Sequence, residues 1–244
     1  MVDNDFGGRP VWLIGAAGTI GQAIARLLSA RGAVLALSGR HRSTLESLAG
    51  SLPGPAIVAP VDLLQETSVR EAAQAIKAEL GPIGSLVTSV SISAFGEFLD
   101  LADGAFVEAM ATKYMGAVRA MRAVLPDMIA QRYGRIVTLS GGSGTNPRPV
   151  HMPGGAANAA LELLSRGVAM RYANDGVRVN VIAPGPISSP RMQAIVASSN
   201  AAGQGDGERP TGQPQDVAEA VAYLLGPRSN FVNGTVLKLD GGVR

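Results

Sequence analysis

The chain has 244 residues, of which 46% are hydrophobic and 16% charged, and its formal net charge is +2 at pH 7. These values fit one globular domain with its own buried core, and the charge is too small to indicate nucleic-acid binding. The absence of cysteine excludes disulfides, thiolate zinc sites and thiol catalysis, and two histidines are too few for a polyhistidine metal site. No apolar run reaches membrane-spanning length, so we expect a cytoplasmic protein that binds no metal and no membrane.

Short apolar runs follow a polar, Gly-rich N-terminus, residues 1–9, which we predict to be flexible. Most of the runs are continuously apolar, as is typical of strands that are buried on both faces. The predicted strands are Val11–Ile14, Val34–Ser38, Ala56–Val61, Leu86–Val90, Arg135–Ser140, Val177–Ala183 and Val236–Asp240.

Longer segments between these runs show apolar residues at spacings of three and four, which predicts helices. The predicted helices are Gly21–Ala30, Ser43–Leu48, Thr67–Leu80, Ala105–Gln131, Ala156–Asn174 and Asp216–Leu225. Strands that alternate with helices imply right-handed crossovers and a parallel sheet. Since no change of composition marks a second domain, we predict one doubly wound α/β domain of the Rossmann type over residues 1–244. It should hold a seven-stranded parallel sheet with helices on both faces.

Three glycines, Gly15, Gly18 and Gly21, stand between the first predicted strand and the first predicted helix. Glycine at such a place permits a tight turn, lets the backbone approach a pyrophosphate, and lets the helix pack closely on the strand. The start of the helix also presents unpaired N–H groups and a partial positive charge to phosphates. This arrangement predicts a dinucleotide site.

The end of the second predicted strand carries Gly39 and Arg40, followed closely by Arg42. A site specific for NAD usually has a carboxylate here to bind the ribose 2′-hydroxyl. No carboxylate is present, and arginine forms charge-assisted bonds to phosphate, so NADP(H) is favoured over NAD(H). Asp62, after the third predicted strand, can either accept a hydrogen bond from the adenine amino group or cap the following helix.

Residues 188–210 form a stretch rich in Ser, Gly and Ala after the predicted strand Val177–Ala183. Ligands bind at the carboxyl ends of strands in sheets of this kind, so we predict a mobile substrate lid; a plain surface loop is the alternative. The apolar residues Met192, Ile195 and Val196 suggest an apolar small-molecule substrate, although core packing explains them equally well.

Motifs along nearly the whole chain resemble those of the short-chain dehydrogenase/reductase family. The glycine turn resembles the family's nucleotide loop, with the middle glycine one place earlier than in the commoner spacing. Arg135–Ser140 and Arg178–Gly185 resemble the family's fifth and sixth strands, and Leu239–Gly242 its C-terminal motif. The resemblance implies that Ile187 and Ser189 hold the nicotinamide carboxamide. The predicted nucleotide contacts are Gly15, Gly18, Thr19, Ile20, Gly21, Arg40, Asp62, Leu63, Ser89, Pro184, Gly185, Ile187 and Ser189.

The family's chemistry, hydride transfer between NAD(P)(H) and an alcohol or carbonyl, uses a Tyr acid/base, a Lys that lowers the Tyr pKa, a Ser and an Asn. Alignment of the flanking motifs puts other residues at these places. Gly154 occupies the position of the Tyr and Asn158 that of the Lys. Gly141 occupies the position of the Ser and Lys113 that of the Asn. Glycine has no titratable group and Asn has no charge, so the usual proton relay is predicted to be absent.

Three interpretations of the altered site remain open. In the first, the chain is an oxidoreductase with relocated groups: Lys113 supplies the cation, His151 transfers protons, and Ser140 is the first of several candidate hydroxyls. In the second, the cleft performs a non-redox reaction such as dehydration or isomerisation. In the third, the chain binds a nucleotide without catalysis. The resemblance also implies a homotetramer or homodimer. Its two contact surfaces are the Ala-rich helices Ala105–Gln131 and Ala156–Asn174, and the C-terminal strand with its helix.

Overall fold

The computed structural model describes residues 6, 8–190, 192 and 211–242. Its seven strands form one parallel sheet in the order β3-β2-β1-β4-β5-β6-β7, which confirms the predicted fold class. The strands are β1 (Val11–Ile14), β2 (Leu35–Ser38), β3 (Ala56–Val58), β4 (Ser85–Thr88), β5 (Gly134–Leu139), β6 (Val177–Pro184) and β7 (Val236–Leu239). The strand order reverses between β1 and β4, and in sheets of this kind ligands bind at the carboxyl edge beside such a switch point.

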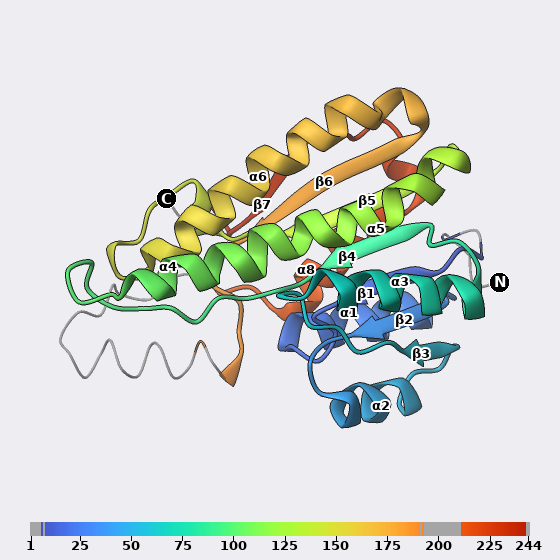
Figure 1. The fold of residues 1–244 in the computed structure, drawn as a ribbon, viewed down its shortest axis with the longest axis horizontal. Coiled ribbons are helices and arrows are strands. Elements are labelled where there is room, and N and C mark those ends of the chain that lie inside the picture. The colour runs from blue at the N-terminus through green and yellow to red at the C-terminus, as the bar shows by residue number, and fades with distance from the viewer. Residues whose placement is uncertain (1–5, 7, 191, 193–210, 243–244) are drawn as a thin grey trace.

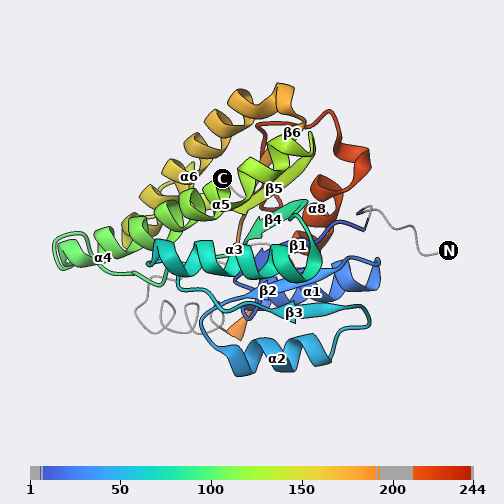
Figure 2. The ribbon, with the colours of Figure 1, turned by 45° about the vertical axis from the view of Figure 1, so that its right-hand side comes forward.

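Helices cover both faces of the sheet, because successive residues of each strand point to opposite sides. Leu13 of β1 joins one apolar cluster and Trp12 joins the other. The layer in front in Figure 1 consists of α3 (Glu66–Leu80), α5 (Gly116–Ala130) and α6 (Met152–Tyr172). On the opposite face α1 (Thr19–Ala30) packs against α8 (Pro214–Leu225), and α2 (Arg42–Gly50) lies near β3 (Figure 2).

The predicted central helix Ala105–Gln131 is divided in the structure. It consists of α4 (Asp103–Ala109), a π-helical segment η1 (Met110–Met115), and α5. A π-helical turn contains more residues than an α-helical turn, and such turns often occur at functional sites. The segment holds Lys113, so the local irregularity coincides with a predicted site residue.

The start of α6 differs from the prediction in a way that matters for the site. A short 3₁₀ turn, Pro149–His151, leads directly into the helix at Met152, with His151 at its N-cap. The helix therefore begins four residues before its predicted start at Ala156. Gly154 and Gly155 belong to its first turn, and Gly154 is buried. Pro153 at the start of the helix favours this earlier beginning, because its fixed φ suits the first turn.

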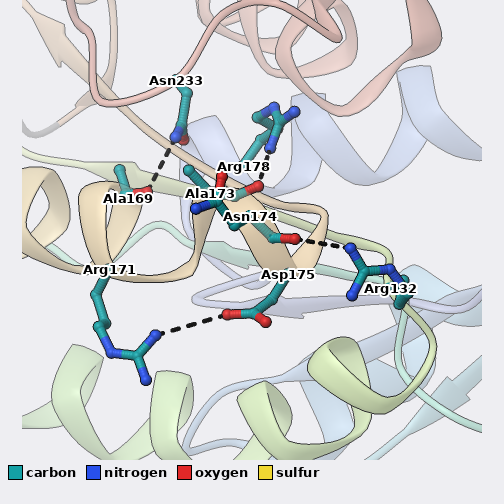
Figure 3. Close-up of polar contacts among 8 residues, drawn as sticks. All are labelled: Arg132, Ala169, Arg171, Ala173, Asn174, Asp175, Arg178 and Asn233. Atoms are coloured by element: carbon teal, nitrogen blue, oxygen red, sulfur yellow. Dashed lines mark hydrogen bonds and ion pairs between the residues drawn. The ribbon is translucent and has the colours of Figure 1, made fainter.

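The far end of α6 is anchored by polar contacts from three other segments (Figure 3). Arg132 donates to the carbonyl of Asn174 at 2.8 Å, and Arg178 of β6 donates to that of Ala173 at 2.9 Å. Asn233 donates to the carbonyl of Ala169 at 3.0 Å. These donors satisfy carbonyls in and just beyond the last turn, and the arginine charges oppose the negative end of the helix dipole. They hold the helix that carries Gly154 and Asn158 near its other end, directly after His151.

Two predicted flexible or mobile segments are described only in part. Most of residues 1–9 lie outside the described residues, but Phe6 is buried in the core and Arg9 stacks on the ring of Tyr133. Most of the predicted lid, including Ile195 and Val196, also lies outside them. The two ends of this segment are joined, since Ile187 forms a parallel bridge with Gly212. Among the described residues, no helix is both long and apolar enough to cross a membrane.

Candidate nucleotide and active site

The glycine turn after β1 lies directly against the chain that follows β4, across the switch point of the sheet. Gly15 has φ +84°, and a Cβ placed there would overlap the carbonyl oxygen of Ser89. A Cβ at Gly21 would overlap the carbonyl oxygen of Gly15 and lie 2.9 Å from the Cα of Ala16. Both positions therefore require glycine, for the close backbone approach that the sequence predicts. The third glycine, Gly18, is less constrained, because its Cβ would lie 3.5 Å from the nearest atom.

The start of α1 is suited to bind an anion. Thr19 and Ile20 are the first two residues of the helix, Gly18 is the N-cap, and no side chain from residues 8–190 or 211–242 caps the helix. The first turn contains no acidic residue. The unpaired N–H groups and the positive end of the helix dipole thus lie next to the glycine turn, and no carboxylate of the first turn competes for them.

The end of β2 leaves room for a phosphate. Arg40 is exposed, and it makes no hydrogen bond or ion pair with any other described residue. Arg42 starts α2 and pairs with Glu46 at 3.4 Å, so it resembles an ordinary solvated residue of a helix start. A Cβ at Gly39 would lie 3.6 Å from Leu45, an ordinary contact. A side chain would therefore fit at position 39, and steric crowding does not explain why this position lacks a carboxylate.

Asp62 and Leu63 follow the third strand, where the adenine is expected. Oδ1 of Asp62 accepts from the backbone N–H of Leu64 at 2.9 Å. The helix itself begins at Glu66, after the N-cap Gln65, so Asp62 caps the preceding turn rather than the helix. The side chain of Leu63 is buried against Gly116 at the start of α5, and its carbonyl accepts from Arg119 at 2.6 Å.

The loop after β6 holds the residues predicted to bind the nicotinamide end. Pro184 ends the strand, and Gly185 donates to the carbonyl of Leu239 at 2.9 Å. A Cβ at Gly185 would lie 2.9 Å from the Cα of Asp240, so the two chain segments are in close contact there. Ile187 is buried, and the hydroxyl of Ser189 accepts from the backbone of Met192 at 3.1 Å.

Lys113 is buried, with 7% of its surface exposed, and its ammonium group points to the end of β5. Nζ donates to the carbonyl oxygen of Ser140 at 2.9 Å. A buried ammonium group is costly unless partners compensate its charge, so this position is unlike that of an ordinary exposed helix lysine. The cation is thus held inside the domain, beside the first residue after β5.

Ser140 also contacts a buried carboxylate that the sequence analysis did not single out. Its hydroxyl donates to Oε1 of Glu162 at 2.8 Å, and Glu162 is only 7% exposed. Lys113 and Glu162, whose side chains differ in charge, therefore bind the same residue, one at its carbonyl oxygen and the other at its hydroxyl. Glu162 follows Asn158 by four residues and so shares its helix face, and this spacing is the sequence signal that would have identified it.

Asn158 fills the space beside the glycines that follow β5. Its Nδ2 donates to the hydroxyl of Ser143 at 3.0 Å, and its buried Oδ1 has no hydrogen-bond partner among the residues that the structure describes. A Cβ at Gly141 would lie 2.9 Å from this amide nitrogen, and a Cβ at Gly144 2.9 Å from the Cβ of Asn158. The side chain of Asn158 thus occupies space that is open only because positions 141 and 144 are glycines.

His151 lies at the outer end of the site. Its Nδ1 is 2.9 Å from the carbonyl oxygen of Ala94, and its ring stacks on Phe95 with 4.2 Å between the ring centroids. His151 lies against Gly154 in the first turn of α6. Ser140 binds Glu162, which lies two turns further along the same helix. Eight residues of helix span about 12 Å. The predicted catalytic residues therefore form an outer group around His151 and an inner group of Lys113 and Ser140, with Asn158 between them.

A parallel sheet with a glycine turn at its switch point, followed by a helix with an uncapped start, defines a nucleotide-binding protein of the Rossmann class. The family model described as enoyl-(acyl carrier protein) reductase matches residues 15–244. The chain belongs to the short-chain dehydrogenase/reductase family of oxidoreductases.

Several known proteins are similar over almost their whole length. Oxidoreductase UcpA of Escherichia coli is 32% identical, over 96% of this chain and 94% of that protein. A Xanthobacter autotrophicus protein named inactive 2-(S)-hydroxypropyl-CoM dehydrogenase 2 is 30% identical, over 90% and 99%. Among solved structures, a gluconate 5-dehydrogenase from Burkholderia cenocepacia in complex with NADP and tartrate is 25% identical, with a TM-score of 0.88 over 99% and 97%. NAD+-bound xylitol dehydrogenase is also 25% identical, with a TM-score of 0.89 over 97% and 99%.

Proposed function

We propose that this chain is an NADP(H)-dependent oxidoreductase that acts on a carbonyl or alcohol substrate with a non-standard set of catalytic residues. The observation that carries the proposal is the close approach of Gly15 to Ser89 beside the uncapped start of α1. This arrangement provides the shape and the N–H groups that a dinucleotide pyrophosphate needs. When bound, the nicotinamide would supply or accept a hydride at the end of the cleft lined by the β6 loop.

The catalytic groups in this proposal are Lys113, Ser140 and His151. Lys113 places a cation beside Ser140, where it can stabilise negative charge that develops on a substrate oxygen. His151 supplies a titratable group at the outer end of the site. The hydroxyl of Ser140 is directed to Glu162, so it acts on the substrate only if this hydrogen bond rearranges. The substrate is a small molecule, and the exposed ring of Phe95, stacked on His151, favours an apolar one.

A second candidate function is nucleotide binding without redox catalysis, or with a non-redox reaction. The predicted loss of the standard Tyr and Lys at Gly154 and Asn158 favours it, and one relative at 30% identity bears the description inactive. Titration of the purified protein with NADPH and NADH, followed by nucleotide fluorescence, tests both functions, because both require binding. Oxidation of bound NADPH by a panel of aldehydes and ketones then separates them: turnover supports the oxidoreductase, and binding without turnover supports the second candidate.

The preference for NADP(H) depends on Arg40. The two solved relatives contain NADP and NAD+ respectively, so they do not decide between the nucleotides. An arginine bond to a phosphate contributes about 1.5–3 kcal/mol, so Arg40→Ala should weaken NADPH binding roughly 10-fold to 100-fold and NADH binding much less. Fluorescence titration of both nucleotides measures the two losses. Arg42→Ala, which removes an arginine paired with Glu46, is the matched control and should change neither affinity appreciably. If Arg40→Ala lowered the affinities for NADPH and NADH equally, Arg40 would not bind the 2′-phosphate.

We further propose that the protein forms a homotetramer or homodimer through α5 and α6. Leu163 and Met170 on α6 are 66% and 81% exposed, and burial of such side chains against a second copy would be favourable. Light scattering coupled to size-exclusion chromatography should give a mass of two or four chains. A monomeric mass at micromolar concentration would contradict this assembly.

A further inference from the structure

A side chain at position 154 would occupy the same space as the imidazole ring of His151. Gly154 is buried in the first turn of α6, and a Cβ built on it would overlap Nε2 and Cε1 of His151 and lie 3.0 Å from Cδ2. No side chain can therefore stand at position 154 while the imidazole keeps its place. The glycine and the histidine are two parts of one arrangement.

The ring is not simply the mobile end of a side chain that would swing aside. Nδ1 is bound to the carbonyl oxygen of Ala94 at 2.9 Å, and the ring lies on that of Phe95 with an interplanar angle of 15°. Since a carbonyl oxygen can only accept, Nδ1 carries a proton. In the neutral ring Nε2 is then the basic nitrogen, and it is the nitrogen that faces Gly154. Stacking of this kind contributes roughly 0.5–1.5 kcal/mol beyond the buried area and fixes the plane of the ring.

We propose that His151 takes over the proton transfer at position 154, and that Phe95 and Gly154 are the positioning residues that hold its Nε2 there. The proposal rests on the proposed oxidoreductase function. In the direction of reduction, the carbonyl carbon receives the hydride that NADPH would supply on its oxidation to NADP+, and the carbonyl oxygen takes the proton from Nε2 of the imidazolium. The imidazole is left neutral and regains a proton from water; oxidation reverses each step.

Histidine resonances test the positioning without any substrate. The chain has two histidines, and His41 at the N-cap of α2 is exposed and serves as an internal reference. In ¹⁵N–¹H spectra of the imidazoles, we expect His151 in the Nδ1–H form. Phe95→Leu should move its Cε1–H resonance downfield, because the ring current of the stacked phenyl is lost. Gly154→Ala should shift all ring resonances of His151, and His41 should stay unchanged in both variants.

Phe98→Leu is the matched control, because Phe98 packs edge-on against Phe106 at 6.3 Å between ring centroids. It should leave the His151 resonances in place. Unchanged His151 resonances in both Phe95→Leu and Gly154→Ala would overturn the positioning, whether or not the protein has activity.

Kinetics test the proton transfer itself. With NADPH and a carbonyl compound that the wild type reduces, His151→Gln should lower kcat about 100-fold, as expected for loss of a general acid. NADPH affinity should not change. Phe95→Leu should lower kcat less, with a changed pH profile. Unchanged kcat in His151→Gln would overturn the catalytic role while leaving the positioning intact. A wild type that reduces no carbonyl compound would overturn the catalytic role together with the proposed function, and the resonances would still report on the positioning.

Discussion

Replacement of Gly15 by alanine is expected to lower the free energy of unfolding by about 2–4 kcal/mol, the combined cost of a left-handed residue and of steric overlap. The added Cβ must avoid the carbonyl oxygen of Ser89, and the backbone already has φ +84°. To relieve the overlap, the turn must move away from the chain after β4, which also displaces the N–H groups at the start of α1. A displacement that costs 1.4 kcal/mol of binding lowers NADPH affinity about tenfold. Chemical denaturation and NADPH titration measure the two effects.

Gly18→Ala is the control for this prediction, because it makes the same chemical change three residues later. The φ of Gly18 is −74°, and its Cβ would lie 3.5 Å from the nearest atom, an ordinary contact. Its stability should stay within about 0.5 kcal/mol of the wild type. If Gly15→Ala and Gly18→Ala had the same midpoint of denaturation, the close approach at the switch point would not be what requires glycine.

Replacement of Lys113 by methionine is expected to lower carbonyl-dependent turnover by about 100-fold or more, within the range found for loss of a catalytic proton-transfer or electrostatic group. Methionine has a similar length and apolar stem, but it removes the cation beside Ser140. The carbonyl of Ser140 loses its donor at 2.9 Å, which should also cost about 1–3 kcal/mol of stability. NADPH affinity should stay close to that of the wild type, because Lys113 lies outside the predicted phosphate contacts. Steady-state kinetics and fluorescence titration separate these effects.

Lys77→Met is the matched control for Lys113→Met. Lys77 is a half-exposed lysine of α3 that pairs with Asp127 at 2.8 Å, and exposed pairs contribute at most about 1 kcal/mol. Its turnover should equal that of the wild type. Equal turnover in Lys113→Met and the wild type would remove Lys113 from the catalytic groups and leave it a structural role at the end of β5.

The fold could be predicted almost completely from the sequence, because its main signals are local. Continuous apolar runs gave all seven strands of the sheet, with boundaries within a few residues of the observed ones. The glycine turn could be placed for the same reason, since Gly15 and Gly21 are fixed by contacts with neighbouring backbone.

The candidate site could be predicted only in part, because its contacts join residues that are far apart in the sequence. Ser140 and Glu162 are 22 residues apart, and His151 meets Ala94 across 57 residues. Two local signals were also misread. The π-helical segment around Lys113 interrupts a pattern that resembles one long helix. The last long helix is predicted to start at Ala156, although Pro153 in its first turn favours the earlier beginning at Met152.

The unequal attachment of the two ends of α6 bears on how this site can evolve. The C-terminal end is held by Arg132, Arg178 and Asn233, whereas no side chain of the described part of the chain caps the N-terminal end at His151. Helix ends without caps open more readily than the rest of the helix. Substitutions in the first turn of α6 can therefore exchange one set of reactive groups for another while the domain stays folded. The C-terminal part of α6 thus keeps its position while residues at its N-terminal end change, and the pair Gly154 and His151 is one combination that this end can carry.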